Sequence, residues 1–98
     1  MTDNKIVLVL FFSEKCGFCK AQDPILEELR ANFLNNIEII KIDIDKDRDK
    51  AKELNVDATP TLFILKNGNI FQKYVGLTYK NELELAINNA IDKQQSAA

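Results

Sequence analysis

The chain has 98 residues, 46% of them hydrophobic, which predicts a single globular domain over residues 1–98 with one core. Thirteen basic and fifteen acidic residues leave a net charge of −2 with no basic tail, so we expect no nucleic-acid partner. No apolar stretch approaches the roughly 20 residues of a membrane-spanning helix, so we expect no membrane partner.

The first predicted element is a strand at 6–12, which is apolar throughout, as in a central strand buried on both faces. A secretion signal is the alternative for this run. However, the run is only seven residues long, Asp3 precedes it, and no small-residue cleavage site separates it from Cys16. We therefore expect a cytoplasmic protein, and a single cysteine pair is compatible with that reducing compartment.

The only cysteines, Cys16 and Cys19, are separated by two residues and lie between this strand and a helical pattern. At a helix N-terminus, free backbone N–H groups and the helix dipole favour the thiolate of Cys16, the form that attacks disulfides. Cys19 can close a small ring with it. The placement predicts a dithiol–disulfide redox centre.

A structural disulfide and half of a zinc site are the alternatives for the same two cysteines. Zinc usually takes four ligands, and this chain has no histidine and no further cysteine. We therefore expect no metal. There is also no glycine-rich phosphate loop, so we expect no bound cofactor besides the redox-active disulfide itself.

Helical and strand patterns alternate after the cysteines. Apolar residues at helical spacing predict a helix that ends at 35–36, with Pro24 inside it as a kink. Alternating residues predict a strand at 37–44, parallel to the first strand across that helix. The charged run at 45–50 is expected to begin a short helix.

The last third of the chain predicts a hairpin and a helix. Two apolar runs, 61–65 and 70–75, flank Asn67-Gly68, a strong signal for a hairpin turn. Thr78 is expected to cap the last helix, and 94–98 to form a frayed tail. The element order β-α-β-α-β-β-α predicts an α/β fold with a mixed four-stranded sheet flanked by helices.

Three motifs together resemble the thioredoxin-fold family, and the resemblance covers nearly the whole chain. They are the Cys-Gly-Phe-Cys loop with Pro24 downstream, the segment 58–61 that reads Ala-Thr-Pro-Thr, and the hairpin that ends at Val75-Gly76. Only fifteen residues precede Cys16, so the chain resembles the minimal thioredoxin fold, closer in length to glutaredoxin.

The resemblance implies a role for each residue of these motifs. Cys16 would be the catalytic nucleophile and Cys19 the thiol that resolves the mixed disulfide. The bond before Pro60 would be cis, and the Thr59 backbone would pair with an extended substrate segment. The candidate substrate-binding residues are Gly17, Phe18, Ala58, Thr59, Pro60 and Gly76.

The chain also departs from the family pattern at the redox loop. Lys15 replaces the common tryptophan before the first cysteine, and Leu10 replaces the buried aspartate six residues before it. The group that deprotonates Cys19 is therefore open: water, Glu14, or Lys41, which matches the family's lysine on the second strand. Lys15 and Lys41 are candidates for proton transfer or for tuning the thiols.

The resemblance implies a monomeric thiol–disulfide oxidoreductase that reduces protein disulfides with electrons from a thioredoxin-reductase-like donor. A glutathione-dependent, glutaredoxin-like reductase is one alternative, favoured by the short N-terminal segment. A thioredoxin-fold binding module or redox sensor without turnover is the other.

Overall fold

The structure, a computed structural model, describes residues 5–96, and its elements follow the predicted order. They are β1 (Ile6–Phe12), α1 (Gly17–Phe33), the 3-10 turn η1 (Leu34–Asn36), β2 (Ile37–Asp43), α2 (Arg48–Glu53), β3 (Thr61–Lys66), β4 (Asn69–Val75) and α3 (Lys80–Ser96). Helix α3 is longer than expected, because it includes 94–96 of the tail that the sequence predicts at 94–98. Residues 97–98 lie outside the described residues.

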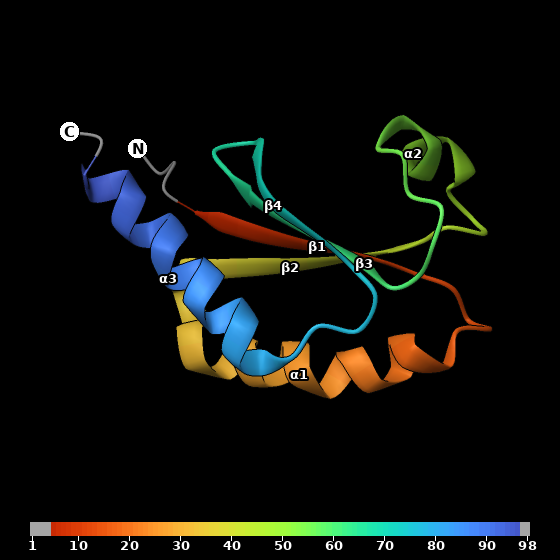
Figure 1. The fold of residues 1–98 in the computed structure, drawn as a ribbon, viewed down its shortest axis with the longest axis horizontal. Helices are drawn as coiled ribbons and strands as arrows, with labels where there is room; N and C mark the ends of the chain where they lie inside the picture. The colour runs from red at the N-terminus through yellow and green to blue at the C-terminus, as the bar shows by residue number, and fades with distance from the viewer. Residues whose placement is uncertain (1–4, 97–98) are drawn as a thin grey trace.

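The four strands form one mixed sheet in the order β2-β1-β3-β4, which confirms the predicted fold class. Strand β1 pairs in parallel with β2 and antiparallel with β3, and β4 completes the sheet antiparallel to β3. Figure 1 shows α1 and α3 against one face of this sheet and α2 against the other. Within residues 5–96, no helix is long and apolar enough to cross a membrane.

Strand β1 contributes to the core on both of its faces, as its continuous apolar sequence predicts. Leu8 and Leu10 belong to the larger apolar cluster, under α1 and α3. Val9 and Phe11 belong to the smaller cluster, under α2. Each fully buried side chain of this size stabilises the fold by about 1.5–3 kcal/mol, so the strand that leads into the cysteines is firmly held.

The predicted hairpin between β3 and β4 is confirmed. Asn67 and Gly68 connect the strands with φ angles of 55° and 83°, and the favoured two-residue hairpin turn requires positive φ at both positions. Asparagine and glycine adopt this conformation at the least steric cost. The turn returns the chain so that Val75 pairs with Thr61, at the start of β3.

Candidate functional site

The two cysteines lie where β1 passes into α1. Cys16 is the N-cap of the helix, one residue before its first turn, and its N–H donates to the Ser13 carbonyl at 3.0 Å. Cys16 and Cys19 are joined as a disulfide, with their Cα atoms 5.4 Å apart. Cys16 is half-buried, whereas Cys19 is only 5% exposed. The pair therefore has an outer sulfur and an inner one.

The register of the sheet brings the other predicted site residues to the same end of the molecule. Phe11 near the end of β1 pairs with Thr61, and Thr61 pairs with Val75. Pro60 comes directly before Thr61, and Gly76 directly after Val75. The segments 58–60 and 75–77 therefore lie at the same end of the sheet as the loop that carries the cysteines.

These two segments are joined to each other by a hydrogen bond. The Gly76 N–H donates to the Pro60 carbonyl at 2.8 Å. The bond between Thr59 and Pro60 is cis, as predicted, and Pro60 is buried. Gly76 has a φ angle of +95°, which side chains other than glycine rarely adopt, so the residue type at this position follows from the backbone.

The remaining predicted substrate-binding residues lie on the accessible side of this region. Gly17, Phe18 and Ala58 are exposed, and Thr59 is half-buried. Phe18, in the first turn of α1, is 66% exposed, and Val75 is 62% exposed. The outer cysteine therefore has exposed apolar side chains on the elements around it, the kind of surface that contacts other proteins.

Gln22 fixes the 76–78 segment to helix α1, a role that the sequence did not reveal. Its side chain is fully buried; Nε2 donates to the Thr78 carbonyl at 2.8 Å, and Oε1 accepts from the Thr78 N–H at 3.0 Å. The one sequence signal is a glutamine four residues before Leu26, on the apolar side of the helix.

The prediction that Thr78 caps the last helix is wrong. The Thr78 hydroxyl donates instead to the Gly76 carbonyl at 3.1 Å, and α3 begins two residues later, at Lys80. Its hydrogen bonds stabilise the segment beside Pro60 rather than the helix N-terminus. Gln22 and Thr78 together therefore position Gly76.

A cavity of about 250 Å³ lies beside the inner cysteine. Its lining residues are Phe12, Ser13, Glu14, Cys19, Lys20, Asp23 and Lys41. Lys41 Nζ lies 3.0 Å from Asp23 Oδ1 and 3.8 Å from Glu27 Oε2. Glu14 and Lys41, two of the candidates for deprotonating Cys19, thus line the same cavity as this cysteine. Lys15 does not line it. Asp23 was not predicted.

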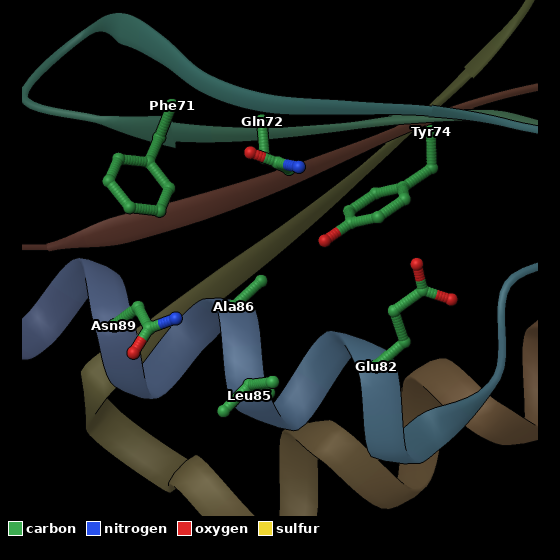
Figure 2. Close-up of a pocket in the computed structure, with 7 residues that line it drawn as sticks. All are labelled: Phe71, Gln72, Tyr74, Glu82, Leu85, Ala86 and Asn89. Carbon is green, nitrogen blue, oxygen red and sulfur yellow. The ribbon is translucent and has the colours of Figure 1, made fainter.

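A second cavity, of about 400 Å³, lies between β4 and α3 and contains none of the predicted site residues. Figure 2 shows Tyr74 from β4 and Glu82 from α3 extending into this cavity from its two sides. Burial raises the pKa of the Tyr74 phenol above its ordinary 10.0, and the negative charge of Glu82 raises it further. No nucleophile or metal-binding cluster accompanies them among the described residues.

Known proteins match the chain over most of its length. The thioredoxin family model matches residues 1–89. Thioredoxin of Bacillus subtilis is 36% identical over 87 residues, which cover 89% of this chain and 84% of that protein. Thioredoxin of Chlamydia trachomatis is 41% identical over 78 residues, which cover 80% of this chain and 76% of that protein.

A solved structure agrees with the sequence matches. Oxidised mitochondrial thioredoxin 3 of Saccharomyces cerevisiae aligns with a TM-score of 0.79 at 31% identity, over 88% of this chain and 79% of that one. The chain belongs to the thioredoxin family. It is a thiol–disulfide oxidoreductase with a Cys16–Cys19 dithiol, and its family implies disulfide-containing protein substrates and a reductase partner.

Proposed function

We propose that this protein reduces disulfides of other proteins, with Cys16 as the nucleophile and Cys19 as the resolving thiol. The difference in exposure between the two sulfurs carries this assignment. A substrate disulfide can reach the half-buried Cys16 directly, whereas Cys19 is 5% exposed and reacts from within the first helical turn.

Two exchange steps move two electrons from the protein to the substrate. The Cys16 thiolate attacks one substrate sulfur, and the other substrate sulfur leaves as a thiolate. The Cys19 thiolate then attacks Cys16 Sγ and breaks the mixed disulfide. The second substrate thiolate leaves, takes a proton from water, and the Cys16–Cys19 disulfide remains.

The position of Cys16 at the N-terminus of α1 supports it as the first of the two thiols to lose its proton. The Cys19 N–H donates to Cys16 Sγ at 3.1 Å, and a donor in this position stabilises a thiolate. The first turn of α1 carries no acidic residue that would oppose the negative charge.

Substrate binding is assigned to the surface formed by Gly17, Phe18, Ala58, Thr59, Pro60 and Gly76. Exposed Phe18 supplies apolar contact area beside the reacting sulfur. The backbone of Thr59 offers hydrogen-bonding groups to an extended substrate segment, in the manner of strand addition. Space beside Gly76 supports this, since a Cβ atom placed there would meet no atom within 4 Å.

The protein acts as a cytoplasmic monomer in this proposal, with no bound cofactor and a thioredoxin-reductase-like donor. Residues 6–12 form an internal strand of the sheet and so belong to the fold. Glutathione is the alternative donor, and its use would make the protein glutaredoxin-like.

Turnover of a protein disulfide tests the proposal. Reduced wild type, Cys16→Ser and Cys19→Ser are mixed with a disulfide-bonded protein, and NADPH consumption is followed with thioredoxin reductase or with glutathione and its reductase. We expect turnover by wild type with thioredoxin reductase, none by Cys16→Ser, and a trapped mixed disulfide with Cys19→Ser. Stoichiometric complexes of wild type without turnover would instead identify a binding module.

A further inference from the structure

The resolving step requires a proton to leave Cys19, and the strand beneath it offers no acceptor. Leu10, on β1, is 1% exposed and pairs with Lys41 on β2, so an apolar side chain is the strand neighbour of the lysine. Cys19 itself is 5% exposed, which restricts direct exchange of its proton with solvent. An acceptor must therefore come from another element.

Asp23, on α1, has the required position. It follows Cys19 by four residues, so both side chains lie on the same face of the helix, about 5–6 Å apart at their Cβ atoms. Both residues line the 250 Å³ cavity, which is large enough for bridging water. Lys41 Nζ lies 3.0 Å from Asp23 Oδ1 and holds the carboxylate at this place.

We propose that Asp23 accepts the proton of Cys19, through water in this cavity, when Cys19 resolves the mixed disulfide. The inference rests on the proposed function. The proton passes from Cys19 to the Asp23 carboxylate, and the resulting Cys19 thiolate attacks Cys16 Sγ. The electron pair of the broken bond leaves on the substrate sulfur, which is protonated by solvent. Asp23 then returns its proton to solvent.

The constant total charge of Cys19, Asp23 and Lys41 favours this proton transfer. Before the transfer, the Lys41 ammonium is paired with the Asp23 carboxylate; afterwards, it remains in the same cavity as the Cys19 thiolate. The net charge of the three groups does not change, so no isolated charge is created beside the buried sulfur. Lys41 is thus a positioning residue and counter-ion, and Asp23 the acceptor.

The other charged groups around the cavity are less suited to the role. Lys20 is a cation, and Glu14 lies in the exposed turn before the helix, with no hydrogen bond or ion pair within residues 5–96. Asp45 accepts a hydrogen bond from Ser13 but does not line the cavity. Glu27 contacts Lys41 at a longer distance, 3.8 Å, and also lies outside the lining.

Single-turnover reaction with the aromatic disulfide dithiobis(nitrobenzoic acid) separates attack from resolution. Attack by Cys16 releases one coloured thiolate, and resolution by Cys19 releases the second. The variants are Asp23→Asn, Asp23→Glu, Glu14→Gln and Glu27→Gln, with Glu27→Gln as the matched control, because it removes a negative partner of Lys41 outside the cavity. The Asp23 side chain is 51% exposed, so Asp23→Asn should fold as wild type does.

We expect Asp23→Asn to slow the second phase by about tenfold or more near neutral pH and to leave the first phase unchanged. The difference should disappear at alkaline pH, where Cys19 ionises without help. Asp23→Glu should restore part of the rate, and Glu27→Gln and Glu14→Gln should react as wild type does.

The sign of the effect distinguishes a proton acceptor from a mere negative charge. If Asp23 acted only through its charge, removing it would favour the Cys19 thiolate and speed the second phase. A faster or unchanged second phase in Asp23→Asn would overturn the inference, as would equal slowing in Glu27→Gln, or slowing in Glu14→Gln alone. Loss of the first phase in wild type would contradict the proposed function instead.

Discussion

Replacing Gln22 with methionine removes both hydrogen bonds that fix the 76–78 segment to α1 while retaining a side chain of similar length. The Thr78 N–H and carbonyl, which bond to Gln22 at 3.0 and 2.8 Å, then lose their partners. Thr78 is 5% exposed and Gln22 fully buried, so water does not readily replace the amide.

The expected loss of stability follows from these two buried backbone groups. Leaving a buried donor or acceptor unsatisfied costs about 1–3 kcal/mol each, so Gln22→Met should lower the free energy of unfolding by about 2–6 kcal/mol. This is a large part of the total of about 5–15 kcal/mol that a domain of this kind has. Urea unfolding followed by circular dichroism measures the difference.

A matched control is Gln72→Met, because Gln72 lies exposed on β4. It should change the free energy of unfolding by no more than about 0.5 kcal/mol. Gln22→Glu is a second probe: it keeps an acceptor for the Thr78 N–H but places an oxygen against the Thr78 carbonyl. If Gln22→Met lowered stability by less than about 1 kcal/mol, the two hydrogen bonds would not hold the segment as argued.

Three further changes test other parts of the structure. Gly76→Ala should destabilise the protein by about 1–2 kcal/mol through its φ of +95° alone, since the added methyl group meets no neighbour; unchanged thermal unfolding would contradict this. The raised pKa of Tyr74 adds stability that is present below its ordinary value of 10.0 and lost as pH rises through the folded value. Wild type should therefore lose stability more steeply than Tyr74→Phe above that pH in denaturant titrations, and parallel curves would refute the assignment. Phe18→Ala should leave unfolding within about 0.5 kcal/mol of wild type, because Phe18 is 66% exposed, but raise KM for a protein disulfide about fivefold; an unaltered KM would remove Phe18 from the binding surface.

The sequence was sufficient wherever one residue type has one strong structural preference. The continuous apolar run at 6–12 indicated a strand buried on both faces, and β1 contributes to both clusters. Asn67-Gly68 indicated a hairpin, since few residues adopt positive φ without strain. The resemblance to a known family added the cis bond before Pro60, which its position alone would not have predicted.

The sequence was insufficient where a partner lies far along the chain. Gln22 and Thr78 are 56 positions apart, and the place of Gln22 on the apolar side of α1 indicates burial but not its partner. The pairing of Lys41 with Asp23 likewise depends on how α1 lies across β2. Local rules indicated that Thr78 was a helix cap. Its hydroxyl donates instead to the Gly76 carbonyl two residues back, and its backbone N–H and carbonyl bond to the distant Gln22.

Helix α3 shows the same limit at the end of the chain. Polar residues after Ile91 suggested fraying, but no proline or glycine follows Gly76 to stop a helix, and α3 extends to Ser96. Composition indicates that a terminal segment is weakly held, whereas the end of a helix depends on the presence of a breaker.

The central place of β1 in the sheet predicts slow hydrogen exchange of its backbone amides. Its backbone is hydrogen-bonded on both sides, to β2 and β3, and Leu8 is inaccessible. Amide protons of such a strand exchange with deuterium only when the whole domain opens, whereas the Asn67-Gly68 turn exchanges through local opening. Cys16 follows β1 by four residues, so the reacting sulfur is attached to a strand that is expected to open only with the whole domain.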